Sequence, residues 1–152
     1  MTQEEVARHE AGHVAACLTL KIPVTMARIE WGPYGLTGGR TRSPDLFDGL
    51  DRDHARKVCR MLMAGWIMEP RELSAYPPGA DSDQLDERWL SSLVRYLKLD
   101  EPAYYGLRSE AFTLTTEDEF VNTFETTVGI FERMPVIDEA GIRLAQRVGG
   151  VR

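Results

Sequence analysis

His9-Glu10-Ala11-Gly12-His13 is the stretch around which the sequence is organised. Histidines four apart on a helix share one face, so both imidazoles can reach one metal ion, at about 2.1 Å for zinc. Glu10 directly follows the first histidine, so its carboxylate lies beside the metal, where it can take a proton from water. The motif predicts His9 and His13 as ligands and Glu10 as general base. The alternative is a chance spacing, which only 3 histidines in 152 residues make uncommon.

The helix that carries the motif is expected to begin almost at the first residue. Thr2 and Glu5 form a T-x-x-E capping box, and Pro23 marks the latest point at which the helix can end. Apolar residues line both the histidine face and the face beside it. A helix that is apolar on two sides is largely buried, and dry surroundings strengthen the electrostatics of a metal site.

Length and composition indicate one ordinary globular domain spanning residues 1–152. The chain is 43% hydrophobic and 28% charged, with a net charge of −6 and no run of lysine or arginine. These values argue against nucleic acid or an anionic membrane as a partner. The acidic first residues do not resemble a signal peptide, and Cys17 and Cys59 fit buried free thiols. We therefore expect a cytoplasmic protein that binds no membrane.

The remaining pattern predicts an α+β fold that is predominantly helical, with about five helices and a small β-hairpin or sheet. Residues 24–31 and 36–42 read as two strands around the turn signal Gly32-Pro33-Tyr34-Gly35. The second strand is either an ordinary glycine-rich edge or an edge that pairs with an extended peptide. Further helices are expected from Asp51 or Asp53, from Asp81 or Ser82, from a capping box at Thr116, and after Pro135, the last one including Ile137. The segment around Tyr104 is helix or turn.

Two histidines do not complete a catalytic zinc site, which usually has three protein ligands and an open position. His54 is the only other histidine, and a histidine at a helix start is more often a surface or capping residue. The third ligand is therefore expected to be a carboxylate from the acidic start of the third helix. At most one of four residues there can serve, namely Asp81, Asp83, Asp86 and Glu87.

The motif and its surroundings resemble the peptidase domain of the FtsH-type AAA+ zinc proteases. That family carries H-E-A-G-H on a helix, a short strand pair, a helix ending in a G-G-R-x-A-E-E-like segment, and a loop with G-A-x-x-D. In matching order this chain has 64–69, Ala-Gly-Trp-Ile-Met-Glu, and 79–83, Gly-Ala-Asp-Ser-Asp. The resemblance covers roughly residues 5–90 and implies a zincin-like fold. It also implies Zn²⁺ held by His9, His13 and Asp83, with Glu10 as the base.

The resemblance has clear limits. The sequence contains no Walker P-loop, no ATPase module and no membrane anchor, and the segment after Asp83 lacks the family's G-M-S-containing stretch. We therefore expect a stand-alone zinc metallopeptidase that cuts short or unfolded peptides. The alternatives are a zinc amide hydrolase for a small metabolite and a non-catalytic, zinc-stabilised interaction domain. The oligomeric state is left open.

Overall fold

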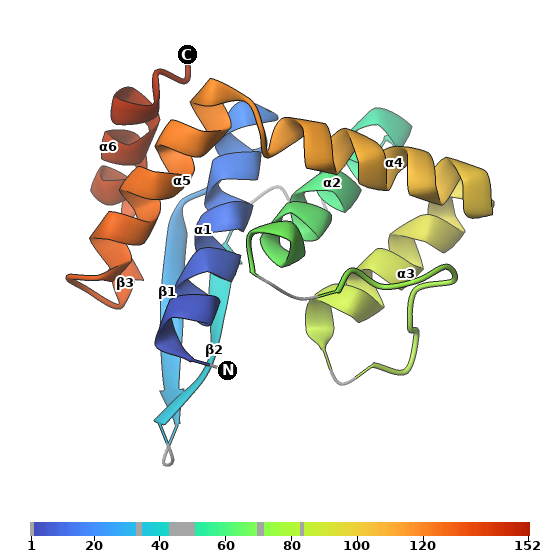
Figure 1. The fold of residues 1–152 in the computed structure, drawn as a ribbon, viewed down its shortest axis with the longest axis horizontal. Coiled ribbons are helices and arrows are strands. Elements are labelled where there is room, and N and C mark those ends of the chain that lie inside the picture. The colour runs from blue at the N-terminus through green and yellow to red at the C-terminus, as the bar shows by residue number, and fades with distance from the viewer. Residues whose placement is uncertain (1, 33–34, 43–50, 70–71, 83) are drawn as a thin grey trace.

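The computed structural model describes residues 2–32, 35–42, 51–69, 72–82 and 84–152, with the backbone alone for 30–32 and 35–42. Its elements are arranged around one central helix (Figure 1). In chain order they are α1 (Gln3–Thr19), β1 (Met26–Gly32), β2 (Gly35–Arg42), α2 (Arg52–Met68), α3 (Leu85–Leu97), α4 (Glu101–Leu114), α5 (Asp118–Phe131), β3 (Val136–Ile137) and α6 (Glu139–Gly149). The expected α+β, predominantly helical class is confirmed.

Helix α1 forms the middle of the core. Its predicted capping box is present: the Glu5 amide donates to Thr2 Oγ1 at 3.1 Å, and the Thr2 amide donates to Glu5 Oε2 at 2.7 Å. From Val6 to Leu18 every residue of α1 is buried except Arg8 and His9, which are half-buried. Helices α2 and α5 and the strands β1 and β2 pack around it. The motif helix is therefore enclosed on several sides, as its two apolar faces predicted.

The sheet is antiparallel with the order β2-β1-β3. The β1–β2 hairpin was predicted, although Pro33 and Tyr34 of its turn lie outside the described residues. The prediction that Ile137 belongs to the last helix is wrong. Ile137 is a buried residue of β3, where it pairs with Ala27 of β1. Helix α6 begins only after Asp138, whose carboxylate accepts a hydrogen bond from the Gly141 amide at 3.0 Å. The capping bond of Asp138 fixes the start of α6, and the pairing with β1 keeps Ile137 in the strand.

Helix starts elsewhere agree with the sequence only in part. Asp51 caps α2 as expected, and the uncertain segment around Tyr104 is helix α4, capped by Asp100. Neither Asp81 nor Ser82 caps α3, because the N-cap is Gln84 and it makes no side-chain capping bond. The capping box expected at Thr116 is also absent. The Thr116 hydroxyl donates to the Thr113 carbonyl instead, and the N-cap of α5 is Glu117, one residue after the expected one.

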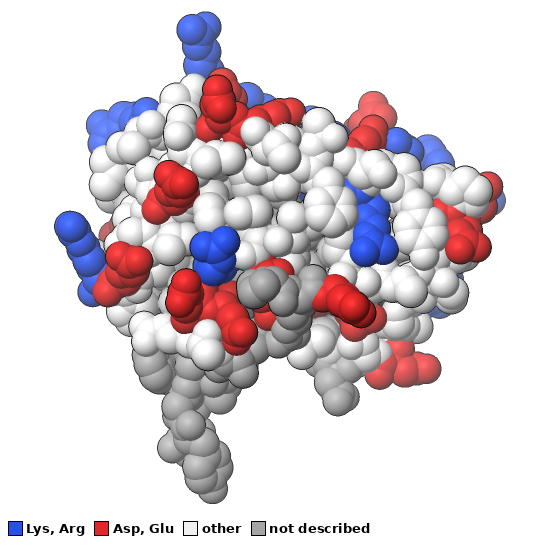
Figure 2. Space-filling view, viewed as in Figure 1, with Lys and Arg blue, Asp and Glu red and all other residues white. Residues whose placement is uncertain are grey.

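The surface carries charges of both signs. On the face shown in Figure 2, lysine and arginine side chains stand apart from one another, with acidic side chains between them. Among the described residues, no helix combines the length and the apolar character that crossing a bilayer requires.

Both cysteines are free and buried, on α1 and α2 respectively, and burial raises the pKa of each thiol to about 12. Because the thiolate is the reactive form, we expect neither Cys17 nor Cys59 to react with a maleimide or an aromatic disulfide at about pH 8 in the native protein. Both should react in denaturant. The control Ser92→Cys, at an exposed position of α3, should react at once. Rapid labelling of a native cysteine in the parent would contradict the described core.

Candidate metal centre

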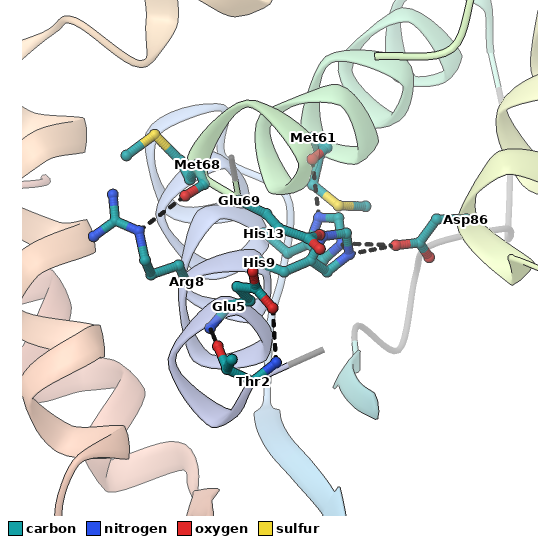
Figure 3. A network of polar contacts seen from close by, with 9 residues as sticks. All are labelled: Thr2, Glu5, Arg8, His9, His13, Met61, Met68, Glu69 and Asp86. Carbon is teal, nitrogen blue, oxygen red and sulfur yellow. Dashed lines mark hydrogen bonds and ion pairs between the residues drawn. The ribbon is translucent and has the colours of Figure 1, made fainter. Parts of the chain in front are cut away.

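The two motif histidines meet on the buried side of α1. Their rings are nearly perpendicular, with centroids 4.4 Å apart, and their Nε2 atoms are 2.9 Å apart. Only 4% of His13 is exposed, and 14% of the His9 side chain. The expected pairing of the two imidazoles on one helix face is present (Figure 3).

One carboxylate from the start of α3 reaches both histidines. Asp86 Oδ2 lies 2.8 Å from His9 Nε2 and 2.9 Å from His13 Nε2 (Figure 3). Of the other acids considered, Asp81 is exposed and Glu87 binds partners in the preceding connector. Asp83, which the family resemblance implies as third ligand, lies outside the described residues. Among the described acids of this segment, Asp86 alone is in contact with the histidines.

The other ring nitrogen of each histidine faces a fixed oxygen. His13 Nδ1 lies 3.0 Å from the Met61 carbonyl of α2, and His9 Nδ1 lies 2.8 Å from Glu69 Oε2. Glu69 is 1% exposed and is the C-cap of α2. If each Nδ1–H donates to these oxygens, each Nε2 presents its lone pair to the other imidazole and to the carboxylate. Histidine ligands of metals are usually oriented in this way.

The close crossing of α1 and α2 makes this arrangement possible. A β-carbon added at Gly12 would lie 2.9 Å from the Ala64 carbonyl oxygen, and one added at Gly65 would collide with the His13 ring. Arg8 fastens the end of α2, because its Nε donates to the Met68 carbonyl at 3.1 Å (Figure 3). The residue after Met68 is Glu69, so the same contact holds the carboxylate that faces His9.

The site favours a positive charge. Burial alone would lower the pKa of His9, but hydrogen bonds with Asp86 and Glu69, together with the Glu10 charge, raise it to about 10. Burial alone would raise the pKa of Asp86, but His13 and His9 hold it well below its usual range. The carboxylates of Glu10, Glu69 and Asp86 therefore surround the two imidazoles. A proton or a metal ion stabilises this group of negative charges.

The donor atoms suit a divalent cation. A carboxylate oxygen of Glu10 and the imidazole nitrogens of His9 and His13 lie within 4.8 Å of one another, a group that can hold a metal ion. Ligand atoms around tetrahedral zinc are roughly 3.3 Å apart. The facing atoms of the two histidines and Asp86 are 2.8–2.9 Å apart, so each of these distances would have to grow by about 0.5 Å to accommodate the ion.

Two features of the candidate site were not assigned from the sequence. Glu69 appeared in the segment that resembles the family, but nothing in that segment indicated that it contacts His9. Asp86 was one of four candidates. Two signals in the sequence could have pointed to them. Glu69 directly follows the apolar pattern of α2, and Asp86 lies in the first turn of α3.

We expect Gly65→Ala to weaken metal binding by roughly 10- to 100-fold, because the added methyl group displaces the His13 ring. The measurement is a Co²⁺ or Zn²⁺ titration against a competing chelator. Gly106→Ala is the matched control, since a β-carbon there has nothing within 4 Å. Equal affinity of the parent and the Gly65 variant would contradict the described packing.

The metal-free protein should lose stability as the pH rises above neutrality. The pKa of His9 is raised from 6.5 to about 10, so its contribution is complete below pH 6.5 and is lost on approaching pH 10. In chelator, the free energy of unfolding should therefore fall between about pH 7 and 9, by at most about 1.4 kcal/mol per pH unit. Urea unfolding measures it. An unchanged slope in His9→Gln would show that His9 does not hold this proton.

Comparison with models of known protein families gives no match for this sequence, and no curated protein matches it either. The family resemblance therefore depends on the motifs of the sequence alone.

Proposed function

We propose that this protein is a zinc metallopeptidase. The observation that carries the proposal is the convergence of His9 Nε2, His13 Nε2 and Asp86 Oδ2 within 2.9 Å, with the Glu10 carboxylate next to them. Two imidazoles and one carboxylate form a common ligand set of catalytic zinc, which keeps a position open for water or substrate. Closed structural sites instead favour four protein ligands and cysteines. This difference favours an enzyme over a purely structural zinc domain.

His9, His13 and Asp86 would hold the ion, and Glu69 and the Met61 carbonyl would orient the two rings. Zn²⁺, when bound, polarises a carbonyl group and lowers the pKa of water to about 7. The donor set also fits other first-row metals, of which zinc is the one that the motif favours.

Glu10 is the proposed general base. It lies on α1 beside the first ligand and is 4% exposed, so its carboxylate is held in a dry environment close to the histidines. Glu10 accepts a proton from the attacking water and passes it to the departing amine. Because the two transfers use one carboxylate, its removal should stop the reaction without emptying the metal site.

A peptide substrate is favoured by the position of β2. The sheet order places β2 at an edge, paired with β1 alone among the described strands, and it packs beside α1 (Figure 1). An extended peptide can add to such an edge through main-chain hydrogen bonds. We expect short or unfolded peptides as substrates, cut in the cytoplasm by a protein similar to the FtsH-type peptidase domain.

The test compares metal content and hydrolysis of a peptide library in three variants. Glu10→Gln should keep zinc but lose about 10²- to 10⁴-fold in kcat, as expected for a lost general base. His13→Ala should lose both zinc and activity. Glu4→Gln, at an exposed glutamate of the same helix, is the matched control and should change neither.

Small amides are assayed beside the peptides. Hydrolysis of one metabolite amide and of no peptide would replace the peptidase by an amide hydrolase. Full zinc occupancy without any hydrolysis would favour the interaction domain. Equal peptide cleavage by Glu10→Gln and the parent would contradict the mechanism.

A further inference from the structure

Glu87, the neighbour of Asp86, is the centre of a second polar cluster. Its Oε1 accepts from Ser74 Oγ at 2.8 Å and from the Gly79 amide at 3.4 Å. Its Oε2 accepts from Ser82 Oγ at 2.6 Å. One side chain in the first turn of α3 thus binds three points of the connector that runs from α2 to α3.

These contacts replace the missing cap of α3. Gln84 makes no side-chain capping bond, but its amide donates to Ser82 Oγ at 3.1 Å, the same hydroxyl that Glu87 binds. Ser82 and Glu87 therefore fix the chain at the point where α3 begins. Asp86 belongs to that first turn. Its direction towards the histidines depends on how this turn is held.

The connector is itself attached to the core. Tyr104 donates its hydroxyl to the Ser74 carbonyl at 2.7 Å, and Tyr76 donates to the Leu99 carbonyl at 3.1 Å. Tyr104 is buried in α4. The Glu87 cluster consequently links the first turn of α3, which carries Asp86, through the connector to α4.

We propose that Glu87 is a positioning residue for the metal centre, which it serves by orienting Asp86 and without touching the ion. This inference depends on the proposed metal site. Residues that orient a metal ligand without binding the metal typically contribute 10- to 100-fold to metal affinity, and their loss also changes the geometry of the ligands. Loss of the Glu87 contacts should therefore change binding and coordination, beyond any effect on stability.

The experiment is a Co²⁺ titration of the metal-free full chain against a competing chelator, with the visible absorption spectrum recorded at saturation. Glu87→Ala should bind about 10- to 100-fold more weakly and show an altered spectrum. Glu87→Gln keeps oxygen and size, and should recover most of the affinity. Glu101→Ala, an exposed glutamate in the first turn of α4, is the matched control and should bind like the parent.

Ser82→Ala is the second variant, because it removes one contact of Glu87 and leaves the helix sequence unchanged; it should shift affinity in the same direction. If Glu87→Ala only lowers the melting temperature, with affinity and spectrum unchanged, the positioning role is wrong while the metal site stands. If the parent itself binds no Co²⁺, the proposed metal site fails and this role with it.

Discussion

Three polar atoms that face one another at hydrogen-bond distance impose the main constraint on this structure. His9 Nε2, His13 Nε2 and Asp86 Oδ2 lie within 2.9 Å, and Glu10 and Glu69 add further negative charge around them. Lone pairs at such distances repel one another unless a cation lies among them or protons bridge them. The fold therefore brings together a group of atoms whose stability depends on a positive charge.

The rest of the molecule holds these atoms in place. Gly12 and Gly65 let α1 and α2 approach closely enough for the Met61 carbonyl and Glu69 to reach the two rings. The connector and the first turn of α3 place the Asp86 carboxylate against the two imidazoles. The proposed ligands thus come from α1 and α3, and the atoms that face the other ring nitrogens come from α2 and its C-cap. Precise placement of this kind is what separates a metal centre from a surface cluster of polar residues.

The sequence predicted the local features well, because they depend on neighbouring residues. The Thr2–Glu5 capping box and the shared face of His9 and His13 follow from helix geometry alone. The choice of carboxylate did not follow, since four acids lie close together between residues 81 and 87, and no local pattern shows which one meets the histidines. That choice depends on the path of the chain between α2 and α3. Glu69 and the pairing of Ile137 with Ala27 likewise depend on contacts between distant segments, which no local pattern encodes.

The decisive measurement is a crystal structure of the protein grown with zinc, with an anomalous difference map at the zinc edge. We expect one strong peak bonded to His9 Nε2, His13 Nε2 and an oxygen of Asp86, with Glu10 beside it and not in the ligand set. A peak bonded to Asp83 in place of Asp86 would contradict the assignment of the third ligand. The absence of any zinc peak between the two histidines would contradict the metal centre itself.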